Sequence, residues 1–195
     1  MTLSTAAPVG KPRETRPPLL AVGAVVWLAS ELMFFSGLFA AYFTMRSTAR
    51  GPWPPEGVEL NARVAGLFTA VLVLSSITVQ LAVRAIARDD RVGFRRWMAV
   101  TVVLAAAFLV NQWHEWDSAT FTIGSHTFGS SFFLMTGFHG LHVLGGVLAM
   151  FLLLGRSASP RFGAADTPAV EVVGYYWHFV DVVWVALYAT LFLLR

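Results

Sequence analysis

The chain has 195 residues, of which 56% are hydrophobic and only 13% are charged. A soluble globular domain carries about a quarter charged residues, so this class is excluded. The formal net charge of +3 reflects arginines between apolar runs, and no basic stripe with interleaved aromatics points to nucleic acid. Because the sequence has no cysteine, it offers no thiolate for zinc, iron–sulfur or dinuclear copper centres.

Five apolar runs follow a proline- and charge-rich start. Residues 1–17 are expected to form a disordered cytoplasmic tail, because such a segment cannot bury apolar surface. Each run exceeds the roughly 20 residues that span a bilayer as a helix. We therefore predict an all-α fold, a polytopic transmembrane bundle within residues 18–195. Its five spans are expected at about 18–45, 62–87, 94–116, 128–154 and 169–194.

The first span carries a carboxylate near the middle of the membrane. Glu31 lies about thirteen residues into the run, or about 20 Å at 1.5 Å per residue. Trp27 shares its helical face, and we expect Glu31 to be buried. One interpretation is a protonated glutamic acid that bonds a neighbouring helix. The other is a proton-linked or lipid-gated site, since ionisable groups at this depth are costly.

The second span begins after Asn61, a residue that commonly caps helix N-termini. Polar side chains interrupt its second half at Ser75, Ser76, Thr78 and Gln80. Hydroxyls and amides within a membrane bundle usually bond across to neighbouring helices. We predict this use for all four.

The fourth span contains two histidines three residues apart, His139 and His142, which therefore could share a metal. A metal needs further convergent ligands, and only Glu31, His178 and Asp181 lie at similar depth. We expect hydrogen bonds between helices and no metal site.

The fifth span has a polar-tipped aromatic face around a carboxylate, with His178 at its edge. This face comprises Trp177, Asp181, Trp184 and Tyr188. If the fourth and fifth spans pack together, Asp181 should find a donor inside the protein, with His142 or His178 as first candidates.

Charge asymmetry predicts the orientation. The N-terminal segment, the turn between spans two and three and the loop between spans four and five hold ten lysines and arginines, against four on the other side. The positive-inside rule then places the N-terminus in the cytoplasm and the C-terminus outside.

Four motifs resemble subunit III of haem–copper terminal oxidases, above all the cytochrome c oxidase type. In chain order they are SELMFF (30–35), WPP (53–55), FHGLHV (138–143) and YYWHFVDVVW (175–184). The resemblance implies the short, five-helix bacterial form, since the longer form has seven helices. It also implies that Glu31 corresponds to the family's buried glutamate, which hydrophobic carbodiimides modify.

By this resemblance, the chain is expected to be a non-catalytic subunit of an aa3-type oxidase in aerobic respiration. Haem and copper would lie in partner subunits, with no catalytic, cofactor or metal residue here. The chain would pack directly on subunit I, associate with subunit II, bind phospholipid and support proton uptake and turnover stability. Its location would be the bacterial plasma membrane, with a larger respiratory supercomplex as a further assembly.

Two alternatives stay open from the sequence. A quinol oxidase or nitric oxide reductase has an equivalent subunit, although the glutamate of SELMFF favours the cytochrome c type. A small ion-coupled transporter could use the intramembrane polar residues as a relay. Inverted repeats and broken helices, typical of transporters, are not seen in the sequence.

Overall fold

The computed structural model describes residues 19–194, so the tail predicted for residues 1–17 lies outside the described part. Within this part, five long α-helices are apolar enough to cross a membrane. They are α1 (Leu19–Thr48), α2 (Ala62–Ala87), α3 (Arg91–Asp117), α4 (Thr127–Arg156) and α5 (Thr167–Tyr188). A 3₁₀ turn, η1 (Ala164–Asp166), precedes α5, and a π-helical turn, η2 (Ala189–Leu193), continues it. The predicted all-α bundle of five spans is confirmed.

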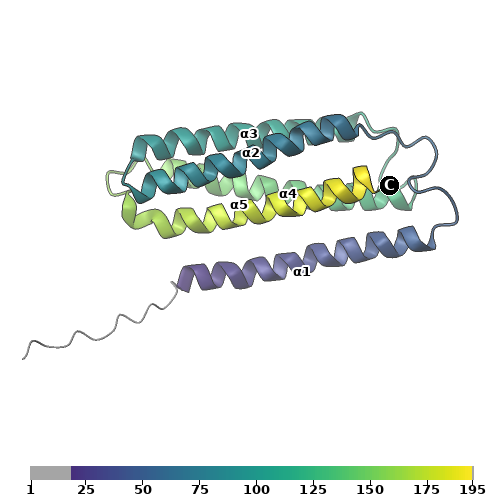
Figure 1. Cartoon of the computed structure of the whole chain (residues 1–195), viewed down its shortest axis with the longest axis horizontal. Coiled ribbons are helices and arrows are strands. Elements are labelled where there is room, and N and C mark those ends of the chain that lie inside the picture. The colour runs from purple at the N-terminus through teal and green to yellow at the C-terminus, as the bar shows by residue number, and fades with distance from the viewer. Residues whose placement is uncertain (1–18, 195) are drawn as a thin grey trace, which may run out of the picture.

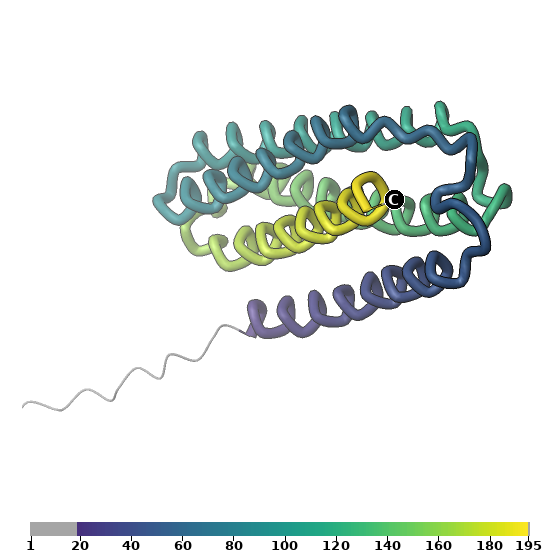
Figure 2. The backbone as a smooth tube through the Cα atoms, turned by 45° about the vertical axis from the view of Figure 1, so that its right-hand side comes forward, coloured from purple at the N-terminus to yellow at the C-terminus, as the bar shows by residue number. Residues whose placement is uncertain are grey.

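Helices α2 to α5 form the compact part of the bundle, and α1 lies at its edge. Helix α2 packs on α3 and α5, α4 packs on α3 and α5, and α1 packs on α4 and α5. Both views show α1 set apart from the group formed by the other helices (Figures 1 and 2). The C-terminus lies at the opposite end of the bundle from the start of α1 (Figure 1). Among residues 19–194, no helix therefore lies against the outward-facing side of α1.

Side-chain hydrogen bonds order the end of the bundle where α1 ends and α2 begins. Asn61 caps α2 as predicted, since its side chain accepts a hydrogen bond from the backbone N–H of Val64 at 3.1 Å. In the preceding loop, the indole of Trp53 donates to the hydroxyl of Tyr42 at 2.9 Å. That hydroxyl donates in turn to the carbonyl of Thr190 at 3.3 Å. Through Tyr42, the loop is thus linked to both α1 and η2.

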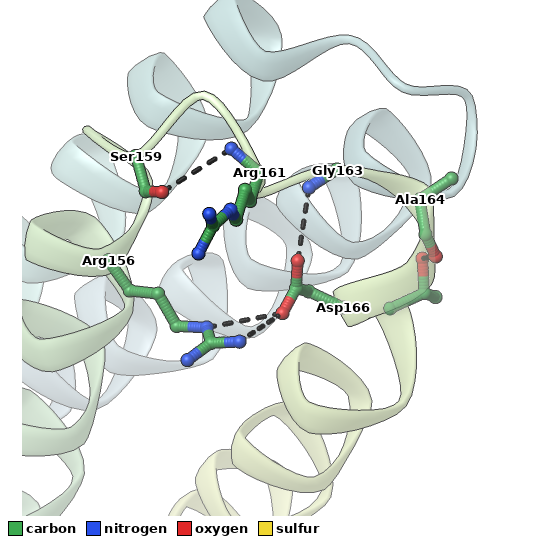
Figure 3. A network of polar contacts seen from close by, with 7 residues as sticks. Arg156, Ser159, Arg161, Gly163, Ala164 and Asp166 are labelled. Atoms are coloured by element: carbon green, nitrogen blue, oxygen red, sulfur yellow. Dashed lines mark hydrogen bonds and ion pairs between the residues drawn. The ribbon is translucent and has the colours of Figure 1, made fainter.

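At the other end of the bundle, charged side chains form hydrogen bonds around the connection between α4 and α5. Arg156 donates to Asp166 Oδ1 through Nε at 3.1 Å and Nη2 at 2.9 Å, and Gly163 N–H donates to Oδ2 at 3.1 Å (Figure 3). The carboxylate of Asp89, in the turn between α2 and α3, accepts from the N–H of Ala164 at 3.1 Å. These contacts hold the short connection between α4 and α5 and so set where α5 begins.

Candidate functional site

The aromatic face of α5 packs against α2 inside the chain. Trp177 and Trp184 are buried, and each donates its indole N–H to a hydroxyl on α2. Near the end of the helix, the Tyr188 hydroxyl also donates to α2, to a backbone carbonyl. The pairs are Trp177 with Ser75 at 2.8 Å, Trp184 with Thr69 at 2.9 Å, and Tyr188 with the carbonyl of Ala62 at 3.0 Å.

Asp181 belongs to the same α2–α5 contact and is only 5% exposed. The hydroxyl of Ser76 is hydrogen-bonded to Asp181 Oδ2 and lies 2.8 Å from His178 Nδ1. A hydroxyl has one proton, so when Ser76 donates to Asp181 its oxygen accepts from the Nδ1–H of His178. His178 Nε2 lies 3.5 Å from Gln80 Oε1, at the limit of hydrogen bonding. The sequence thus predicted an internal partner correctly but named the wrong donor.

The error has a geometric cause. The face of α5 that carries Asp181 turns toward α2, so His142 on α4 is not its partner, and His178 shares the Ser76 hydroxyl instead of meeting the carboxylate directly. Ser76 was among the α2 side chains expected to bond across helices, and that expectation is confirmed for all four. The remaining three bonds are Ser75 to Trp177, Thr78 to Thr101 at 2.7 Å, and Gln80 to His178.

A second polar pair joins α1 to α4. His142 Nε2 lies 3.1 Å from Glu31 Oε2, and His142 Nδ1 lies 2.7 Å from the carbonyl oxygen of Phe138. A carbonyl only accepts, so Nδ1 carries a proton. Nε2 then either accepts a hydrogen bond from the hydroxyl of neutral Glu31 or donates one to its carboxylate. In both arrangements a single proton lies between the two residues.

Aromatic rings surround this pair. Phe35 lies edge-on to His142 with ring centroids 4.9 Å apart, and Trp27 stacks on Tyr176 at 5.1 Å. The Tyr176 hydroxyl donates to the backbone carbonyl of His142 at 2.8 Å. Trp27 is 46% exposed and lies at the edge of the contact between α1 and α5.

Glu31 was expected to be buried, but its side chain is 23% exposed, against 17% for His142. The reason is the edge position of α1, which leaves part of the helix without a neighbour from the described part of the chain. The Glu31–His142 pair therefore lies at the boundary between the bundle and whatever surrounds it.

The two histidines of α4 point in different directions. His139 is fully buried, stacked on Trp184 at 4.9 Å and edge-on to Phe108 at 5.9 Å. Among the described residues, neither of its ring nitrogens has a hydrogen-bond partner, so the expected hydrogen bond to another helix was wrong for His139, because its ring lies between the aromatic rings of Phe108 and Trp184. His139 and His142 thus do not converge. Within residues 19–194, no three histidine or acidic side chains cluster closely enough to hold a metal.

Because their environments differ, replacing each histidine should change the free energy of unfolding by a different amount. His139→Leu should change the free energy of unfolding by less than about 1 kcal/mol, because it removes two unpartnered polar atoms from the core. His142→Leu should cost about 1–3 kcal/mol, because it leaves Glu31 without its partner. Thermal melting of the detergent-solubilised protein compares the two. A larger loss for His139→Leu would show that the buried imidazole has a partner such as water.

Comparison with known proteins identifies the family of the chain. Residues 10–194 match the family model for cytochrome c oxidase subunit III. A probable cytochrome c oxidase subunit 3 of Nocardia farcinica is 48% identical over 183 residues, which are 92% of this chain and 90% of the relative. A probable subunit 3 of Mycobacterium leprae is 46% identical over 100% of this chain and 97% of its own. A subunit 3 of Corynebacterium diphtheriae is 44% identical, covering 97% and 95%. The chain belongs to the cytochrome c oxidase subunit III family.

Proposed function

We propose that the chain is the non-catalytic third subunit of an aa3-type cytochrome c oxidase in a bacterial plasma membrane. The observation that carries this proposal is the family match over residues 10–194, together with relatives of nearly the same extent. In this function the chain packs on the haem-bearing subunit I, and haem and copper belong to partner subunits. Its five histidines and absent cysteines support that division of roles.

The Glu31–His142 pair is proposed as the proton-linked element of the subunit. It holds one proton between an acid and an imidazole, lies at mid-depth in α1 and is partly open at the edge of the bundle. Such a pair can take up or release a proton without leaving two unpaired charges in the membrane. The apolar, outward side of α1 beside it, which includes Leu32 and Met33, suits phospholipid acyl chains.

The test is copurification. An affinity-tagged chain, isolated from its native membranes in mild detergent, should bring down haem-bearing partners and the absorbance of a-type haem. The complex should oxidise reduced cytochrome c in preference to quinol. The same chain expressed alone should carry neither a Soret band nor stoichiometric metal. Haem or copper bound to the isolated chain, or a tagged chain from native membranes without haem-bearing partners, would contradict the proposal.

A further inference from the structure

A row of polar side chains follows the contact between α2 and α5 from one end of the bundle to mid-depth. It begins at Glu171, four residues from the start of α5, and ends at Asp181, 14 residues from that start. Gln80, His178 and Ser76 lie between them, with the contacts given above. At 1.5 Å per residue, this polar row covers about 15 Å along the helix axis. That is about half of a hydrocarbon core of about 30 Å.

A small cavity lies at the Glu171 end of the polar row. Its volume is about 50 Å³, and its surface is more polar than apolar. The residues that line it are Gln80, Val83, Glu171, Gly174 and Tyr175. A cavity needs about 10–15 Å³ to hold a water molecule, which also needs about two to four polar partners. A carboxylate, an amide and a phenolic hydroxyl among the lining residues can supply these partners, so the cavity suits water.

The polar row is more than is needed to hold the two helices together. Three uncharged side chains, those of Trp177, Trp184 and Tyr188, already join α5 to α2 by hydrogen bonds. An acid and an imidazole at mid-depth, Asp181 and His178, are much more costly than such groups. Packing alone also does not require a polar cavity at the end of the row. Ionisable groups in line with a space for water indicate a path for protons.

Every hydrogen bond at the inner end of the row can reverse its direction. In the first arrangement, His178 Nδ1–H donates to the Ser76 hydroxyl, which donates to the Asp181 carboxylate, and Nε2 is free to accept. When a proton arrives at Nε2, the Nδ1 proton passes to Ser76 and the Ser76 proton passes to Asp181. In the second arrangement, neutral Asp181 donates to Ser76 and Ser76 donates to Nδ1. The Nε2–H of His178 then faces an acceptor, Gln80 Oε1. One proton has entered and one carboxylate has been neutralised.

We infer that Asp181 is a proton-binding site inside the membrane, loaded through His178 and Ser76 from water in the small cavity. The contact between His178 Nε2 and Gln80 is at the limit of hydrogen bonding, so a water molecule can replace the amide there and deliver the proton. The site is separate from the Glu31–His142 pair. It depends on the fold of this chain and not on the identity of its partner subunits.

The other titratable groups on the helices packed against α5 are engaged elsewhere. Glu31 on α1 pairs with His142 on α4. His139 on α4 lies among aromatic rings, with no hydrogen-bond partner in the described part of the chain. The titratable residues of α2 are Arg63 and Arg84, which lie near its two ends. The proton on the site is therefore exchanged along the polar row.

Infrared spectroscopy in H₂O and D₂O tests the inference on the tagged chain, purified from native membranes with the partners that it retains. Neutral Asp181 has a carboxyl C=O stretching band, which is identified by its loss in Asp181→Asn. We expect this band to appear as the pH is lowered and to shift as soon as D₂O replaces H₂O. The absence of the band at every pH at which the protein is folded would overturn the inference. A band that shifts only after unfolding would also overturn it.

A cavity-filling variant tests the route. Gly174→Ala adds a methyl group to the cavity, and its Cβ would lie 3.5 Å from Cγ2 of Val83, an ordinary contact. The hydrogen bonds of the polar row stay intact, so a merely structural role would not be affected. Deuterium exchange at Asp181 should slow by at least about tenfold, because it then waits for local opening of the helix pair.

Gly155→Ala is the matched control, because a Cβ at this helical glycine meets nothing within 4 Å. It should leave the exchange rate unchanged, and thermal melting should show both variants folded. Equal exchange rates in the two variants would contradict a route through the cavity. Haem recovered with the same samples tests the proposed function separately, so a failure of that proposal is distinguishable from a failure of this one.

Discussion

Gly146→Val is expected to prevent the chain from accumulating in the membrane as a folded bundle. A Cβ atom at Gly146 would lie 2.7 Å from Cε3 and 2.8 Å from Cζ3 of Trp177, closer than real Cβ contacts come. Trp177 is fully buried, and its indole N–H is bonded to Ser75, so the ring cannot shift freely. Valine adds two more methyl groups to this contact, and we expect a loss of about 3 kcal/mol or more.

The measurement is the amount of tagged chain in the membrane fraction, followed by thermal melting of whatever is recovered. Gly155→Val is the control, because it lies on the same helix and a Cβ there meets nothing within 4 Å. The control should accumulate normally. Equal accumulation of both variants would mean that α4 and α5 can separate at little cost.

Glu31→Lys is expected to abolish assembly with the haem-bearing subunit, whereas Glu31→Gln should leave assembly intact. The glutamine amide can donate to His142 Nε2, which accepts when Nδ1 donates to the carbonyl of Phe138. Lysine would place a cation beside the imidazole, without the Glu31 carboxylate that could pair with it. A charge at this depth costs at least about 2.5–3.5 kcal/mol, which corresponds to a weakening of association of roughly a hundredfold.

The ratio of haem to tagged chain after copurification measures this effect. The Glu31→Gln variant and the unmodified chain should give the same ratio. The Glu31→Lys variant should recover almost no haem, although the chain is still inserted in the membrane. Normal haem recovery with Glu31→Lys would show that the side chain reaches water or a lipid headgroup from the edge position of α1.

Several features could be predicted from the sequence because they depend on local physics. A backbone in lipid must satisfy its own hydrogen bonds, so five long apolar runs predict five helices whatever their arrangement. The cap at Asn61 depends on residues within one turn. The polar residues from Ser75 to Gln80 had to find partners across a helix contact, because lipid offers none.

The choice of partner was decided by the tertiary structure. Helical periodicity shows which residues share a face, such as Trp177 with Asp181, but it does not show which neighbouring helix that face meets. A short connection favoured α4 as the partner of Asp181, yet the rotation of α5 turns this face to Ser76 on α2. The close fit of Trp177 over Gly146 holds α5 at that rotation.

Helical periodicity likewise does not show which neighbours the two histidines of α4 meet. Their spacing of three residues is compatible with one shared site, but a difference of three positions on a helix also separates side chains by about 60° of rotation. With α1 on one side and α5 on the other, that angle is enough to send His142 to Glu31 and His139 into the core beside Trp184. The sequence by itself determined which polar residues lie within the membrane, but it did not show that His139 would be left without a hydrogen-bond partner among the described residues. Which residue pairs with which was decided by the rotation of each helix, because that rotation depends on side-chain packing along whole helix contacts.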